Sequence, residues 1–225
     1  MDHTGEAIGQ TLALAFGVAL SPFPIIAVIL MLFTPKARTN GPAFAAGWFV
    51  GIVVVGGLVL AFGGQISDSP ASTTSGLVKL VLGLGLLLLA VRNWQKRPKD
   101  TEDAQMPKWM GAIDSFGPAK AAGMAAALSG INPKNLLLTA AAATTVSSLA
   151  LSTGEEVGWL IVFAVLASLT VAAPVALLLV MGDRADAILS TWKTWLAQNN
   201  TVVMAVLLLL LGIKLLGDGI SILAG

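Results

Sequence analysis

Long apolar stretches dominate the pattern of hydrophobic and polar positions along this chain. Six of them are long enough for a membrane-spanning helix, which needs about 20 mostly apolar residues. They cover residues 8–33, 41–63, 76–94, 119–146, 157–182 and 201–223. The pattern therefore predicts an all-α integral membrane protein with six transmembrane helices. The first stretch follows an acidic segment (Asp2, Glu6) and is longer than a signal peptide, so we expect a retained helix.

The composition indicates that lipid is the main solvent of this chain. Hydrophobic residues make up 56% of the sequence and charged residues 11%, whereas a soluble domain carries about 25% charged residues. Without Cys and with His3 as its single histidine, the sequence offers no thiolate or histidine metal site and no Ser-His-Asp triad. The net charge of +1 argues against nucleic acid as a partner. Because the common enzyme motifs are also missing from the sequence, we expect neither an enzyme nor a cofactor.

The positively charged residues predict the orientation of the spans. Ten of the 13 Lys and Arg residues lie in the loops after the first, third and fifth stretches or within three residues of them. Loops rich in Lys and Arg face the cytoplasm. We therefore predict a multi-pass protein of the plasma membrane with both termini on the extracytoplasmic side.

The longest of these loops, residues 95–118, is predicted to be a cytoplasmic linker. Within it, Met106, Trp109, Met110 and Ile113 recur at helical spacing, which is typical of a short amphipathic helix on the inner leaflet. A similar pattern precedes the sixth stretch, formed by Ile188, Leu189, Trp192, Trp195 and Leu196. Loops that touch the membrane would explain both segments as well as amphipathic helices would.

The two halves of the chain resemble each other. The first stretch is broken at residues 21–24 and the fourth at residues 132–135, at similar depths. A repeat of three spans is odd, so its second copy must enter the membrane from the opposite side. This predicts a single membrane domain, residues 1–225, built from two inverted three-helix repeats at about 8–94 and 119–223. Such repeats place transport sites on interrupted helices near mid-membrane.

Each break indicates the start of a new half-helix inside the bilayer. Proline ends the helix before it, Ser21 and Asn132 are of residue types favoured as N-caps, and Pro22 and Pro133 suit the first helical position. The freed backbone groups must face protein or a wet cavity, and helix N-termini suit an anionic group. We expect the residues of both breaks to face one central cavity and to bind the substrate there. They are Ser21, Pro22, Pro24, Asn132, Pro133, Lys134 and Asn135.

Lys134 adds a full charge beside the second break. A lysine at mid-membrane costs about 2.5–3.5 kcal/mol on insertion scales, and no carboxylate lies in the interior of a predicted span to pair with it. This indicates an anionic substrate, or a neutral lysine. In the alternative interpretation, Lys134 extends its ammonium toward the interface or hydrogen-bonds carbonyl groups freed by the break.

Two further patterns predict packing rather than substrate binding. Lys214 and Asp218 are one helical turn apart near the end of the sixth stretch, which predicts an ion pair at the rim. Ala43, Gly47 and Gly51 form a stripe of small residues, which is typical of close helix packing or of a dimer contact.

Five motifs carry a family resemblance: ALSPFPII (19–26), TPKAR (34–38), NPKNLLL (132–138), GDRA (182–185) and LGIKLLGDG (211–219). Together they resemble the glycopeptidolipid-addressing (GAP) family, which includes the sulfolipid-addressing (Sap) proteins of mycobacteria and belongs to the lysine-exporter (LysE) superfamily. The resemblance implies six spans from duplicated three-span units, a role in export and often a homodimer. It also implies a cell-envelope lipid or glycolipid of actinobacteria as cargo.

The function predicted from these features is export of an anionic or amphipathic cell-envelope lipid or glycolipid by a plasma-membrane transporter. One alternative is an exporter of a small solute, an amino acid or a metal ion, as in other branches of the superfamily. A second alternative is a non-transporting membrane partner of a lipid-export machine. A lateral opening to lipid would favour the first function, and a closed, water-filled pocket would favour a small solute.

Overall fold

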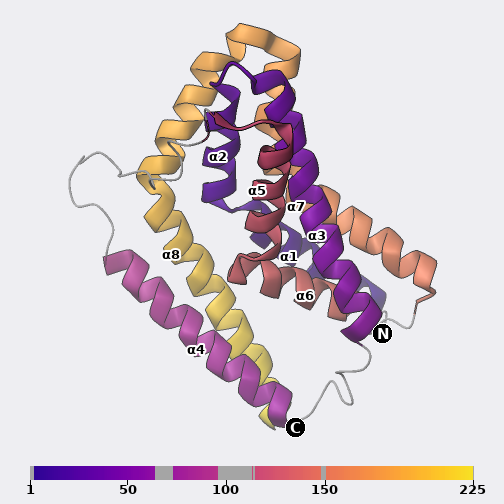
Figure 1. The fold of residues 1–225 in the computed structure, drawn as a ribbon. Helices are drawn as coiled ribbons and strands as arrows, with labels where there is room; N and C mark the ends of the chain where they lie inside the picture. Colours follow the sequence, from indigo (N-terminus) through magenta and orange to yellow (C-terminus); the bar gives the residue numbers. More distant parts are fainter. Residues whose placement is uncertain (1–2, 64–72, 96–112, 114, 148–150, 225) are drawn as a thin grey trace. The chain divides into compact units, whose positions relative to one another are not determined.

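The computed structural model describes residues 3–63, 73–95, 113, 115–147 and 151–224. These residues are helical with short connections and contain no strand, which confirms the predicted all-α class. In chain order the helices are α1 (His3–Ala19), α2 (Pro22–Leu32), α3 (Ala37–Gly63), α4 (Thr73–Gln95), α5 (Pro118–Gly130), α6 (Pro133–Ser147), α7 (Thr153–Met181), the 3-10 helix η2 (Gly182–Ala185) and α8 (Asp186–Ala224) (Figure 1).

The ends of the helices follow local sequence signals. Pro22 and Pro133 each begin a helix, because proline cannot continue the helix before it. α7 begins with a capping box, in which Ser152 Oγ accepts the Glu155 N–H at 3.4 Å and Glu155 Oε2 accepts the Ser152 N–H at 2.9 Å. α7 ends at Gly182, whose φ of 56° lies in the left-handed region that favours glycine.

The described helices include several that could cross a membrane. By length and composition, Ala37–Phe62, Thr153–Asn199 and Thr201–Ala224 qualify. The pair Thr11–Ala19 and Pro22–Leu32 qualifies as one span bent by 48°. The described residues thus hold three to four candidate spans, in agreement with a multi-pass membrane protein. α4 and the pair α5–α6 occupy the two other predicted stretches without meeting this criterion.

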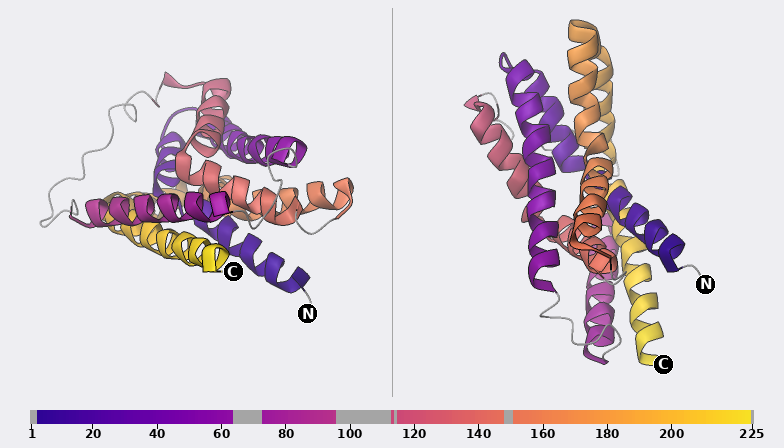
Figure 2. Two further views of the ribbon diagram at one scale, coloured as in Figure 1. Left: turned by 90° about the horizontal axis from the view of Figure 1, so that it is seen from below. Right: turned by 90° about the vertical axis from the view of Figure 1, so that its right-hand side faces the viewer.

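The chain divides into two compact units, of which unit 1 comprises Met1–Ile66 and Met106–Thr194. In unit 1, α3 packs against α5, α6 and α7, while α1 packs against α6 and α7 (Figure 2). The short helix α2 is the most enclosed element, because nine of its eleven residues are buried. Its partners are α3 and α7, so the half-helix after the first break is surrounded by protein rather than lipid.

The small-residue stripe of α3 packs against α5 of the same chain. A Cβ added at Gly47 would collide with the backbone of Ala122, and one at Gly51 would lie 2.8 Å from the Ala126 carbonyl oxygen. α3 and α5 pack against each other (Figure 2). The predicted close packing is therefore confirmed, with α5 as the partner helix.

Unit 2 comprises Ser67–Gln105 and Trp195–Gly225. Here α4 and α8 approach each other at pairs of glycines. A Cβ added at Gly83 would lie 3.0 Å from the Gly212 carbonyl oxygen, and one at Gly219 would lie 2.9 Å from that of Gly76. The numbering of the two pairs runs in opposite directions, so α4 and this part of α8 pack antiparallel.

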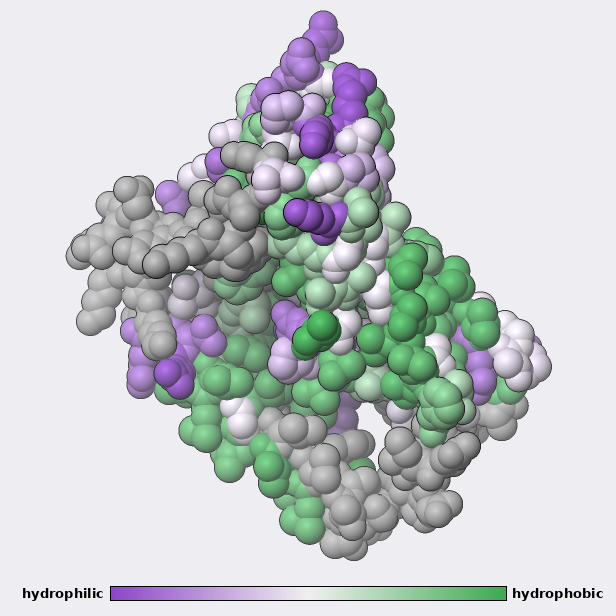
Figure 3. Space-filling view, viewed as in Figure 1, coloured by the Kyte–Doolittle hydropathy of each residue, from purple (hydrophilic) through white to green (hydrophobic). Residues whose placement is uncertain are grey.

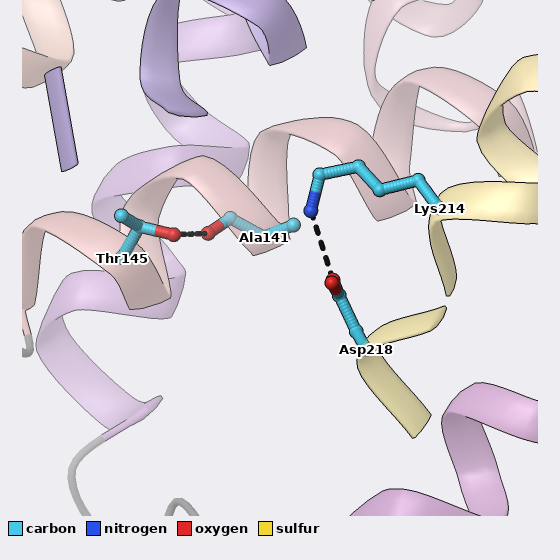
Figure 4. Close-up of polar contacts among 4 residues, drawn as sticks. All are labelled: Ala141, Thr145, Lys214 and Asp218. Atoms are coloured by element: carbon cyan, nitrogen blue, oxygen red, sulfur yellow. Dashed lines mark hydrogen bonds and ion pairs between the residues drawn. The ribbon is translucent and has the colours of Figure 1, made fainter. Parts of the chain in front are cut away.

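The predicted ion pair on α8 is present. Lys214 Nζ lies 2.8 Å from Asp218 Oδ2, and both side chains are exposed (Figure 4). The pair is a surface feature of the helix, as its spacing indicated.

The two predicted amphipathic segments differ in how much of each the structure describes. Residues 106–112 of the first lie outside the described residues, whereas Ile113 at its end is buried. Residues 188–196 are not a separate element before the last span. They belong to α8, which continues from Asp186 to Ala224 because no proline interrupts it. Leu189 is fully buried, whereas Trp195 is exposed.

Candidate functional site

The two helix breaks meet in unit 1 at a group of mostly buried polar residues, which we call the break cluster. It is formed by Ser21, Asn132, Lys134, Asn135 and Thr170. The side chains come from both breaks and from α7, and the Thr170 hydroxyl bonds a carbonyl 151 residues earlier in the sequence.

At the first break, Ser21 connects to the second. Its Oγ donates to Asn135 Oδ1 at 3.1 Å, and both side chains are buried. Ser21 stands at the N-cap position of α2, but its side chain makes no capping hydrogen bond. The predicted capping role of Ser21 is therefore wrong, because its hydroxyl is turned away to Asn135. The contact between the two breaks is direct, so these two side chains leave no cavity between them.

The second break is organised locally. Asn132 Oδ1 accepts the Lys134 N–H at 3.0 Å, so Asn132 caps α6 as its residue type predicted. Asn135, the other amide of this break, donates from Nδ2 to the Leu128 carbonyl at 3.2 Å, in the last turn of α5. Asn135 therefore bridges α5 and α6 and also reaches Ser21.

The three prolines of the predicted site differ in burial. Pro22 and Pro24 are buried in the first turn of α2, while Pro133 is exposed at the start of α6. The prolines shape the helix starts, and the polar contacts come from their neighbours in sequence.

Lys134 is 8% exposed, and its Nζ donates to the Gly17 carbonyl at 2.8 Å. That carbonyl is freed by the first break, because the N–H four residues later, that of Ser21, bonds instead to Ala19 at 2.8 Å. The ammonium thus lies at the C-terminal end of α1, where the helix dipole is negative. This contact corresponds to the alternative interpretation, in which Lys134 hydrogen-bonds a freed carbonyl. An ammonium has three hydrogens to donate, and among the described residues Lys134 makes this one side-chain hydrogen bond and no ion pair.

Two residues, one in the break cluster and one beside it, could not be found from the sequence. Thr170 Oγ1, on α7, donates to the Ala19 carbonyl at 2.6 Å, which also accepts the Ser21 N–H at 2.8 Å. Thr139 lies one turn beyond Asn135 on α6, and its buried Oγ1 has no partner among the described residues. The sequence signal for these two residues was a hydroxyl side chain within an apolar stretch. It was weak because such hydroxyls commonly bond their own helix, as Ser168 Oγ does with the Ala164 carbonyl at 2.6 Å.

The comparison with protein families assigns the chain. A family model described as Sap, sulfolipid-1-addressing protein, matches residues 11–221. The chain belongs to this Sap family. The match covers both breaks and both units, and it confirms the resemblance carried by the sequence motifs. No curated protein and no solved structure matches the chain.

The break cluster of this Sap-family chain has a definite chemical character. It combines a lysine with amides and hydroxyls, which together bind oxyanions and hydroxyl groups better than cations. The described residues contain no group of three His, Cys, Asp or Glu side chains that could hold a metal ion. The family match and the apolar helices support a lipid-related role at a membrane.

Proposed function

We propose that the protein is a plasma-membrane transporter that exports an anionic or amphipathic cell-envelope lipid or glycolipid. The family description supports a lipid as cargo, because it names the addressing of a sulfolipid. The observation that carries the proposal is Lys134, a lysine buried among apolar helices at the point where two helices are broken. Ionisable residues within membrane-spanning segments usually mark a substrate pathway.

In this proposal, Lys134 attracts the acidic headgroup of the cargo. Its ammonium remains bonded to Gly17, and its other hydrogens bind an oxyanion as the helices around the breaks move apart. Asn135 and the unpaired hydroxyl of Thr139 offer further hydrogen bonds to sugar or headgroup oxygens. The direct contact of Ser21 with Asn135 closes the site when cargo is absent.

We further propose that the fold consists of six spans in two inverted repeats, α1–α2, α3, α4 and α5–α6, α7, α8. The packing within unit 1 supports this arrangement. α3 packs against α5 and α6, whereas α7 packs against α1 and α2. The second helix of each half therefore contacts the broken helix of the other half, an exchange expected from two-fold symmetry. In this scheme the loops rich in Lys and Arg face the cytoplasm and both termini lie outside.

Reconstitution of the purified full chain into phosphatidylcholine liposomes tests the function. The liposomes contain an envelope-lipid extract of the native host, and movement of its acidic lipids between leaflets is measured by mass spectrometry after surface modification. We expect acidic lipids to cross faster than in protein-free liposomes. If radiolabelled lysine or a metal ion crosses and lipids do not, the protein is a small-solute exporter. If nothing crosses, and host cells without the protein still lose envelope-lipid export, it is a non-transporting partner of an export machine.

A further inference from the structure

An open cavity of about 470 Å³ lies in unit 1, away from the break cluster. It is formed where α2 leads into α3 and where α7 leads through η2 into α8. Its apolar wall comes from Leu32, Phe33 and Leu178. The volume falls within the range of about 300–1,000 Å³ that is typical of small-ligand sites.

Charged side chains of both signs line the rest of this cavity. Lys36 and Arg38 come from the α2–α3 connection, and Asp183 and Asp186 from η2 and the start of α8. The only ion pair among the described residues is that of Lys214 with Asp218 on α8, so these four charges do not neutralise one another within 4.0 Å. All four side chains are exposed, so a ligand can reach them.

A third cation lies at the apolar wall. Lys193 Nζ, on α8, is 5.3 Å from the centroid of the Phe33 ring. Phe33 is 40% exposed, so its ring offers apolar surface directly beside an ammonium. Cationic groups next to exposed apolar surface match the junction between a headgroup and its acyl chains.

The cavity lies at the level where apolar helices end. α2 closes the bent apolar pair, and α3 begins a candidate span directly after the polar connection. Viewed in space-filling form, hydrophilic surface gathers at this end of unit 1, where the α2–α3 and α7–α8 connections lie, and gives way to hydrophobic surface along the helices (Figure 3). Lipid headgroups occupy this boundary in a bilayer.

We propose that this cavity binds the headgroup of a membrane lipid that carries an oxyanion, phosphate or sulfate, together with hydroxyl groups. Lys36 and Arg38 bind the oxyanion, because cationic donors make the stronger hydrogen bonds to charged oxygens. Asp183 and Asp186 accept hydrogen bonds from the hydroxyls. Leu32, Phe33 and Leu178 contact the start of the acyl chains. The inference rests on the proposed function in one respect: the cavity, on the side predicted to be cytoplasmic, is where the exported lipid is first bound.

The test uses the full chain in detergent micelles and native mass spectrometry with three probes. Short-chain phosphatidylglycerol supplies an oxyanion and hydroxyls, short-chain phosphatidylcholine supplies the oxyanion without hydroxyls, and glycerol phosphate lacks acyl chains. We expect phosphatidylglycerol to bind most tightly and glycerol phosphate most weakly. Glycerol phosphate binding as tightly as phosphatidylglycerol would overturn the lipid assignment in favour of a soluble anion.

Three variants locate the site. Lys36→Ala with Arg38→Ala should weaken the binding of phosphatidylglycerol roughly tenfold, since each removes a charged donor. Asp183→Ala with Asp186→Ala should lower the ratio of phosphatidylglycerol to phosphatidylcholine affinity. Lys120→Ala removes an exposed lysine that does not line the cavity, and it should bind as the wild type does. Unfolding midpoints are compared to confirm that all variants are folded.

The outcomes separate the cavity from the transport proposal. Wild-type binding by Lys36→Ala with Arg38→Ala, or an equal loss in Lys120→Ala, would overturn the binding site. An unchanged affinity ratio in the aspartate variant would overturn the hydroxyl contact. If binding is lost but lipid export in cells continues, the cavity does not load the transporter. If wild-type protein binds the lipid and moves no lipid in liposomes, the transport proposal fails while the binding site stands.

Discussion

Each of the two helix breaks has a serine or asparagine followed by proline. The two breaks nevertheless differ in which groups hydrogen-bond the backbone there. At the second break, Asn132 satisfies the Lys134 N–H two residues away. At the first break, the Ser21 side chain makes no capping bond, and two carbonyls of α1 accept hydrogen bonds from Lys134 on α6 and Thr170 on α7. The second break is therefore stabilised by neighbours in sequence, and the first by the tertiary structure.

This difference indicates which break can open. A helix end that depends on partners from other helices loses its hydrogen bonds when those helices move, whereas a locally capped end keeps them. The first break should therefore be the part of the break cluster that responds to cargo. The variants below test this comparison by removing long-range and local partners separately.

Removing Asn135 should have the largest effect on stability, because this residue joins the two breaks. Asn135→Ala leaves the Ser21 hydroxyl and the Leu128 carbonyl without their partner and opens a small cavity. We expect the free energy of unfolding to fall by about 2–4 kcal/mol, measured in mixed micelles. Asn199→Ala is the matched control, since among the described residues Asn199 bonds only the Trp195 carbonyl of its own helix. Equal losses in the two variants would contradict the bridging role.

Thr170→Val should destabilise the first break selectively. Valine has nearly the same shape as threonine but cannot donate to the Ala19 carbonyl. We expect a loss of about 1–2 kcal/mol in the free energy of unfolding. A cysteine introduced near the end of α1 should also be labelled faster than in the parent protein. Thr144→Val is the matched control, because among the described residues the Thr144 hydroxyl bonds only the Ala140 carbonyl, four residues earlier in α6. The neighbouring Thr145 hydroxyl makes the same kind of bond to the Ala141 carbonyl (Figure 4). If both variants behave alike, the long-range bond has no special role.

Asn132→Ala should act locally at the second break. Loss of the cap leaves the Lys134 N–H without its partner, at a cost of about 1 kcal/mol. Asn132→Ser should restore most of this stability, since serine also caps helices. The labelling rate of a cysteine introduced near the end of α1 should stay unchanged in Asn132→Ala. Increased labelling there would show that the two breaks are not independent.

Lys214→Met should have the smallest effect. Both side chains of the ion pair with Asp218 are exposed on the surface of α8, and exposed pairs contribute about 0.2–1 kcal/mol. We expect the unfolding free energy to change by no more than this amount and lipid export to remain at the wild-type level. A strong loss of export would place α8 in the transport path.

Part of the break cluster could be predicted from the sequence, because proline acts locally. The Ser21-Pro22 and Asn132-Pro133 pairs correctly marked where α2 and α6 begin. The stripe with Gly47 likewise predicted close packing, since small residues allow backbones to approach.

The partners of the first break could not be predicted from the sequence. Which side chains donate to the Gly17 and Ala19 carbonyls depends on how α6 and α7 pack against α1, and local spacing carries no information about this. For the same reason Ser21 was predicted to cap α2, although the buried amide of Asn135 is its actual partner. The charged cavity at the α2–α3 connection could not be predicted either, because in the sequence Lys36 and Arg38 indicate orientation and a family resemblance but not their proximity to Asp183 and Asp186.

The most direct test of the transport proposal is lipid export by Lys134 variants at matched membrane abundance. Lys134→Ala removes the charge that we propose binds the headgroup, and Lys134→Arg keeps it. We predict that appearance of acidic envelope lipid at the cell surface falls roughly tenfold or more in Lys134→Ala and falls less in Lys134→Arg. Wild-type export by Lys134→Ala would contradict the account, because Lys134 would then be a structural partner of the Gly17 carbonyl and not part of the substrate site.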